Sequence, residues 1–157
     1  MSAIEYFCEE GVVLDLEAGD KEGVIRRLVE AAAAMGKIKR GRAEEVVAKV
    51  LEREEIGSTG IGHGVAVPHA RAAGVKELVG VFGRLREPVE FQALDGRPVD
   101  LVFLLLSPTP SSGEHLEVLA ALAMIARHEL YRRFLRQAKD AEEAYEVLKE
   151  AFEEAGS

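Results

Sequence analysis

Three of the four histidines lie where an imidazole can do chemistry, in loops or at the ends of expected elements: His63, His69 and His115. A neutral imidazole is a nucleophile, a general base or a metal ligand near neutral pH. A histidine taken alone is more often a hydrogen-bonded structural or surface residue, so its neighbours decide how it is interpreted. The fourth histidine, His128, lies on a charged stretch and is expected to be such a surface residue.

A stretch unusually rich in glycine precedes His69. Residues 57–64 read Gly-Ser-Thr-Gly-Ile-Gly-His-Gly, which predicts a loop because glycine disfavours a helix and such small side chains could not fill a core strand. The glycines let the backbone approach a ligand closely, and Ser58 and Thr59 add small hydroxyls. The spacing fits neither a dinucleotide fingerprint nor a nucleotide P-loop, but exposed N–H groups in such a loop can bind one phosphoryl group.

A histidine that accepts a phosphoryl group needs a neutral ring nitrogen, a nearby cation and hydrogen-bond donors for the phosphoryl oxygens. His69 follows Pro68 at the end of an expected strand, beside the loop. Arg53 could supply the cation, or it could be a solvated helix-end residue paired with a neighbouring glutamate. His115 could supply a donor, with the dipole at its helix N-terminus favouring the neutral ring, or it could simply cap the helix.

Two other chemistries would use some of the same residues. A metal site could use the three histidines, but the sequence has neither a His-Glu-x-x-His pattern nor a cysteine pair, since Cys8 is the single cysteine. A serine hydrolase would need Gly-x-Ser-x-Gly, which the residues around Ser58 do not form. We therefore expect no metal and no other cofactor.

The elements that must position these residues are helices before, between and after four or five strands. Asp20 and Asp140 are expected helix N-caps, and Gly36 is expected to end the first helix. Ser111 and Glu114 have the spacing of a capping box. From hydrophobic periodicity, strands are expected at 12–16, 65–69, 78–85 and 99–107, and helices at 21–35, at 42–54, from 111–114 onward, at 130–137 and from 140 onward.

Composition excludes several classes of protein. The 157 residues include 28 acidic and 20 basic side chains, and the net charge of −8 argues against a nucleic-acid binder, which needs Lys and Arg to neutralise phosphates. The longest apolar runs, 101–106 and 118–126, are shorter than the roughly 18 residues that span a bilayer, so no membrane insertion is expected. The N-terminus lacks a signal-peptide pattern, and the single cysteine suggests a reducing compartment, so a cytoplasmic protein is predicted.

The motifs, taken in order, resemble enzyme IIA of the fructose, mannitol and nitrogen-regulatory branch of the bacterial phosphotransferase system. The resemblance covers nearly the whole chain. Its most specific part is a Pro-His pair in a glycine-rich setting, followed by a strand that ends in Leu-Ser-Pro and then by His-Leu. The matching segments are Glu52-Arg53-Glu54, 58–62, 64–69, 88–91, Asp95-Gly96, 99–108 and His115-Leu116.

The resemblance implies an α+β fold, with a mixed β-sheet of four or five strands flanked by helices in a single domain of residues 1–157. It implies that His69 is phosphorylated by the phosphocarrier HPr or a nitrogen-type HPr, and that Arg53 and His115 assist at the phosphoryl group. Ser58 and Thr59 are weaker phosphoryl-binding candidates. His63 stands where relatives often have asparagine or another polar residue, which leaves its role open.

Two functions share this expected site. One is a phosphocarrier for sugar uptake that passes the phosphoryl group from His69 to a IIB component. The alternative is a nitrogen-type regulatory protein, in which phosphorylation of His69 switches binding to a target protein. The neighbouring genes would distinguish the two functions, because sugar uptake requires a IIB and a transporter component.

Overall fold

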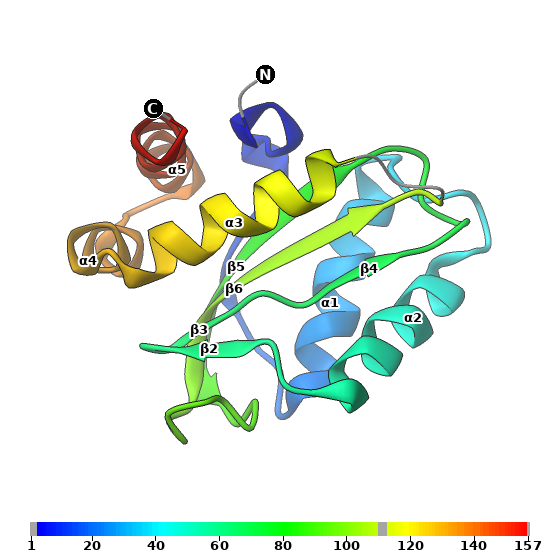
Figure 1. Ribbon diagram of the computed structural model, residues 1–157, viewed down its shortest axis with the longest axis horizontal. Coiled ribbons are helices and arrows are strands. Elements are labelled where there is room, and N and C mark those ends of the chain that lie inside the picture. Colours follow the sequence, from blue (N-terminus) through cyan, green and yellow to red (C-terminus); the bar gives the residue numbers. More distant parts are fainter. Residues whose placement is uncertain (1–2, 110–112, 157) are drawn as a thin grey trace.

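The computed structural model describes residues 3–109 and 113–156 (Figure 1). Its centre is a mixed six-stranded sheet in the order β1-β5-β6-β3-β2, with β4 pairing with β6 beyond β3. β5 and β6 are antiparallel, as are β2 and β3, whereas β1 runs parallel to β5, and β3 and β4 run parallel to β6. The strands are β1 (Val12–Leu16), β2 (Gly60–Gly62), β3 (Val65–Ala66), β4 (His69–Arg71), β5 (Val79–Val89) and β6 (Val99–Ser107).

Helices cover both faces of the sheet (Figure 1). The helices are α1 (Lys21–Ala34), α2 (Ala43–Ile56), α3 (Glu114–Arg127), α4 (Glu129–Gln137) and α5 (Ala141–Ala155), with short 3-10 helices η1 (Ala3–Tyr6) and η2 (Glu9–Gly11). One buried cluster joins α1 and α2 to the sheet, and a second joins α3, α4 and α5 to its other face. None of these helices within the described ranges is both long enough and apolar enough to cross a bilayer.

β6 is the central strand because nearly every residue in it is apolar and buried. Successive side chains of a strand point to opposite faces, and β6 follows this rule: Leu104 joins the α1/α2 cluster, whereas Phe103 and Leu105 join the α3/α4/α5 cluster. The strand ends at Ser107, and α3 begins a few residues later. The first turn of α3 lies at the end of the sheet where β4 lies, because His115 contacts Ser107 of β6 and His69 of β4.

The α+β fold class and mixed sheet implied by the resemblance are confirmed, as are two of the expected helix caps. Asp20 accepts a hydrogen bond from the Gly23 N–H at 2.8 Å, and Asp140 accepts one from the Glu143 N–H at 2.9 Å. The expected capping box involves Ser111, which lies outside the described residues.

The secondary structure predicted from the sequence was wrong in two segments near the site. As a result, the sheet has six strands where four or five were expected. The expected loop at 57–64 contains β2, because the backbone there pairs antiparallel with β3. Glycine suits residue 60, since a Cβ there would lie 2.8 Å from the Ala93 Cβ. The expected strand at 65–69 is divided into β3 and β4, since Pro68 has no N–H to donate to a sheet.

Candidate functional site

His69 is the first residue of β4 and pairs in register with Leu105 of β6. Its Nδ1 lies 2.8 Å from the carbonyl oxygen of Val67. Since a carbonyl only accepts hydrogen bonds, Nδ1 carries the proton and Nε2 keeps its lone pair. Burial lowers the pKa of His69 below its ordinary value, and the positive charge of Arg53 adds to the lowering, although the hydrogen bond to Val67 opposes it. The ring is thus a neutral nucleophile at neutral pH.

The ring of His115 lies beside that of His69, with centroids 5.7 Å apart and ring planes at 66°. It is 2% exposed, and its Nδ1 lies 2.6 Å from the hydroxyl oxygen of Ser107 at the end of β6. Burial lowers the pKa of His115 to about 4, with smaller contributions from the charges of Arg71 and His69. This low pKa favours the neutral ring that the sequence predicts, and burial rather than the helix dipole is its main cause.

Arg53 lies in the last turn of α2, half-buried, and donates a hydrogen bond to the Gly57 carbonyl at 2.8 Å. Within the described ranges its guanidinium forms no ion pair, because Glu54 pairs with Lys21 and Glu52 lies near Lys49. Its charge instead acts on His69, whose pKa it lowers. The guanidinium therefore remains available to an anion at this edge of the sheet.

The hydroxyls of Ser58 and Thr59 already have protein partners. The Ser58 hydroxyl donates to the Phe91 carbonyl and accepts from the Gly60 N–H at 2.9 Å. Thr59 is buried, and its hydroxyl donates to Glu54. Both hydroxyls hold the glycine-rich segment in place, and their binding of a phosphoryl group stays a prediction.

The sequence analysis missed Arg71 and Ser107. Arg71 follows His69 by two residues in β4, so both side chains leave the same face of the strand. Arg71 pairs in register with Ser107, and its charge lowers the pKa of both His69 and His115. The two-residue spacing would have identified Arg71 if the expected strand had continued past residue 69.

His63 is not brought to this site. It forms the turn between β2 and β3 with a φ of +60°, and its side chain is exposed. Its N–H donates to Asp95 at 3.0 Å and its carbonyl accepts from Arg136 at 2.8 Å, so its backbone is held on both sides. The turn lies beside Leu101 of β6, whereas His69 pairs with Leu105 of the same strand. Four residues along a strand, at roughly 3.3 Å each, separate the two positions by about 13 Å.

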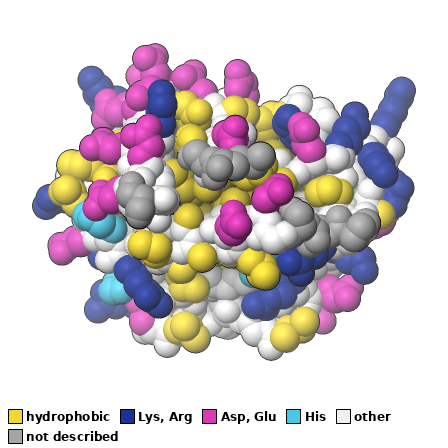
Figure 2. All heavy atoms as spheres, turned by 45° about the horizontal axis from the view of Figure 1, so that its top comes forward, with side chains coloured by type: hydrophobic (Ala, Val, Ile, Leu, Met, Phe, Trp, Pro, Cys, Tyr) yellow, Lys and Arg dark blue, Asp and Glu magenta, His cyan; other side chains and the backbone are white. Residues whose placement is uncertain are grey.

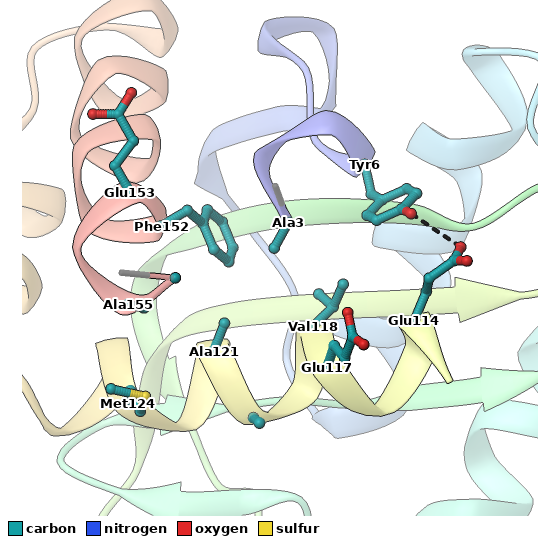
Figure 3. A pocket seen from close by; sticks show the side chains of 12 residues that line it. Ala3, Tyr6, Glu114, Glu117, Val118, Ala121, Met124, Phe152, Glu153 and Ala155 are labelled. Atoms are coloured by element: carbon teal, nitrogen blue, oxygen red, sulfur yellow. Dashed lines mark hydrogen bonds between the residues drawn. The ribbon is translucent and has the colours of Figure 1, made fainter. Parts of the chain in front are cut away.

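A cavity of about 710 Å³ lies between α3, α5 and η1 rather than at His69 (Figure 3). Apolar residues such as Val118 and Phe152 form its floor, and Glu117 and Glu153 lie at its edge. Figure 2 shows hydrophobic side chains between acidic ones on this face of the molecule. Among the described residues, no group of three His, Cys, Asp or Glu side chains is placed to hold a metal ion.

The geometry therefore offers a neutral nucleophilic nitrogen on His69, a second neutral imidazole beside it, and two guanidinium groups. Such a set can accept a group that carries negative charge, because cations and N–H donors stabilise the charge on the transferred oxygens. The His69 ring is half-buried, and β4 pairs with β6 alone among the described strands, so the ring lies at an edge of the sheet.

The chain is similar to known proteins over most of its length. The family model described as "Phosphoenolpyruvate-dependent sugar phosphotransferase system, EIIA 2" matches residues 5–151. A nitrogen regulatory protein of Bradyrhizobium diazoefficiens is 36% identical over 149 residues, which are 94% of this chain and 95% of the relative.

Two solved structures are also similar. The crystal structure of nitrogen regulatory protein IIA-Ntr from Neisseria meningitidis superposes with a TM-score of 0.82 at 40% identity, covering 92% of this chain and 97% of that one. The mannitol enzyme IIA of Escherichia coli, solved in complex with phosphorylated enzyme IIB, superposes with a TM-score of 0.77 at 25% identity. The match covers 92% of this chain and 99% of that one.

Proposed function

The chain belongs to the EIIA 2 family of the phosphoenolpyruvate-dependent sugar phosphotransferase system, and we propose that it is a phosphocarrier that uses Nε2 of His69. It accepts the phosphoryl group from HPr or a nitrogen-type HPr and passes it to a IIB component. The observation that carries the proposal is the hydrogen bond from Nδ1 of His69 to Val67, which leaves the Nε2 lone pair free beside His115.

The transfer needs no external acid or base. The donor carries the phosphoryl group on an imidazole that is protonated at its other nitrogen. The lone pair on Nε2 of His69 attacks phosphorus, the Nε2–P bond forms as the donor N–P bond breaks, and the donor leaves as neutral imidazole with that electron pair. His69 keeps its Nδ1 proton, so its phosphorylated ring becomes positively charged.

The neighbouring groups stabilise the charge on the phosphoryl oxygens during transfer. Arg53 and Arg71 supply positive charge on the side of the acceptor. When the Ser107 hydroxyl donates to Nδ1 of His115, the second nitrogen of that ring carries a proton and becomes a neutral donor. A neutral donor suits this place, because a third cation beside two arginines would itself be destabilised.

A regulatory function is the second candidate. Two of the relatives described above, at 36% and 40% identity, carry the name nitrogen regulatory protein. In this case His69 accepts the phosphoryl group by the same chemistry, and its phosphorylation state switches binding to a target protein. The charge on the phosphoryl group, about −1.5 to −2 at pH 7 for typical phosphate esters, would make the surface around His69 differ strongly between the two states.

Phosphorylation with purified components tests the shared step. Incubated with phosphoenolpyruvate, enzyme I and HPr, the protein should form an acid-labile, base-stable phosphoprotein. His69→Ala should abolish the label, whereas His63→Ala, at an exposed turn away from the site, should retain it. Full labelling of His69→Ala would overturn the assignment. Onward transfer to an added IIB protein would favour the sugar phosphocarrier over the regulatory function.

A further inference from the structure

Glu54 is a buried acidic residue in the last turn of α2, with 7% of its surface exposed. Its carboxylate accepts a hydrogen bond from Lys21 Nζ at 3.0 Å, which connects α2 to α1. It also accepts two hydrogen bonds from Thr59, one from the backbone N–H at 3.3 Å and one from the hydroxyl. Thr59, which lies in the glycine-rich segment after α2, is thus held by both of its donors.

A continuous set of hydrogen bonds connects Glu54 to His69. The carbonyl of Thr59 accepts a hydrogen bond from the Val67 N–H at 3.0 Å. The carbonyl of Val67 in turn accepts the hydrogen bond from Nδ1 of His69 at 2.8 Å. Two residues, Thr59 and Val67, therefore separate the buried carboxylate from the ring that accepts the phosphoryl group.

Stability alone is a weak reason for this arrangement. Burying an ion pair such as Lys21–Glu54 removes two charges from water, and this cost offsets most of their attraction. The carboxylate does have a consequence at the site, because its negative charge raises the pKa of His69 against the lowering by Arg53 and burial.

We propose that Glu54 is a positioning residue for phosphoryl transfer. Through Thr59 and Val67 it fixes the carbonyl that holds the Nδ1 proton of His69. Its negative charge stabilises the positive charge that the imidazole acquires when Nε2 is phosphorylated. The inference rests on the proposed function, since that function supplies the phosphorylated ring.

The other titratable groups near His69 lie on four elements, and the two arginines among them act in the opposite sense to Glu54. Arg53 on α2 and Arg71 on β4 both lower the pKa of His69, and His115 on α3 is neutral above about pH 4. Lys21 on α1 pairs directly with Glu54. Of the groups that act on His69, Glu54 is the one whose negative charge favours a positively charged ring.

The matched variants are Glu54→Gln and Glu55→Gln. Both remove one negative charge from the end of α2 with nearly the same side-chain shape, but Glu55 is exposed. An NMR pH titration of the unphosphorylated protein should show a lower His69 pKa in Glu54→Gln and a pKa close to wild type in Glu55→Gln. This titration requires no phosphoryl donor, so it tests Glu54 even if the chain proves not to be phosphorylated.

Single-turnover transfer from phosphorylated HPr gives the second measurement. Glu54→Gln should lower the limiting rate about 10-fold or more, as is typical for partners that orient a reacting group through another residue. The donor concentration at half-maximal rate should change little, because Glu54 is buried. Unchanged His69 pKa and unchanged rate in Glu54→Gln would overturn the proposal.

A second pair of variants covers the case in which Glu54→Gln does not fold. Thr59→Val removes the hydroxyl that donates to Glu54, whereas Thr59→Ser keeps it. We expect Thr59→Val to transfer more slowly than Thr59→Ser. Equal rates in this pair would contradict the connection from Glu54 to His69.

Discussion

The Nδ1 of His69 donates a hydrogen bond to the carbonyl of Val67, which precedes it by two residues. β3 ends at Ala66 and β4 begins at His69, so the Val67 carbonyl lies between two strands and can accept from a side chain. The short distance along the chain makes the tautomer of His69 a local property of the Val-Pro-His segment. The lone pair of Nε2 is therefore left free before any partner binds.

Replacing Arg53 should slow phosphoryl transfer without unfolding the protein. Arg53→Ala removes a cation that faces the site, and loss of one group aimed at developing charge typically costs about 100-fold in rate. Arg27→Ala is the matched control, since Arg27 also donates to a backbone carbonyl, that of Glu17, but on α1. Single-turnover transfer and the melting temperature of both variants check this. Normal transfer by Arg53→Ala would make Arg53 a structural residue.

Arg71 should affect the two histidines together. Its charge lowers the pKa of His69 and of His115, so Arg71→Ala should raise both pKa values and also slow transfer. An NMR titration of the two imidazoles in Arg71→Ala and in Arg71→Lys, which keeps the charge, is the direct measurement. If both pKa values stay at their wild-type values in Arg71→Ala, Arg71 lies too far from the site to act in transfer.

Acid should destabilise the protein through His115. Its pKa of about 4 lies below the value of about 6.5 in an unfolded chain, so the unfolded state binds more protons between these pH values. The contribution of the neutral ring to stability is complete above pH 6.5 and is lost as the pH falls toward 4, by up to about 3 kcal/mol.

Chemical denaturation at pH 7 and pH 4.5 measures this contribution. His115→Gln cannot be protonated and should lose less stability between the two pH values than the wild type. His63→Gln, with an exposed histidine, serves as control and should resemble the wild type. Equal losses in His115→Gln and the wild type would show that the acid sensitivity arises elsewhere.

Docking of the donor should depend on salt. The chain has a net charge of −8, and the family resemblance implies a small carrier with basic residues around its own histidine. The Debye length shortens from about 10 Å at 0.1 M salt to about 3 Å at 1 M, so the second-order rate constant for transfer should fall as salt rises. The limiting rate at saturating donor should change less. Stopped-flow measurements at several donor concentrations separate the second-order rate constant from the limiting rate. A second-order rate constant that does not depend on salt would indicate apolar docking.

The sequence by itself determined the local features of this protein. The caps at Asp20 and Asp140 and the apolar run of β6 follow from side-chain chemistry within a few residues, and all three are present. The Pro-His pair beside a glycine-rich segment indicated His69 as the candidate acceptor for the same reason. Such features need no knowledge of distant contacts.

The tertiary structure decided which residues share the site. β2 is part of the sheet because it pairs with β3, which in turn pairs with Leu101 and Val102 of β6, a contact across more than thirty residues that no local pattern reveals. Pairing of β4 with β6 places Arg71 opposite Ser107, and Ser107 then holds His115 beside His69. His63 was a candidate by residue type, yet the same pairing leaves it at another part of the sheet. Burial of His115 and the charges around it depend on packing between elements, so its low pKa could be assigned to its main cause only after the fold was known.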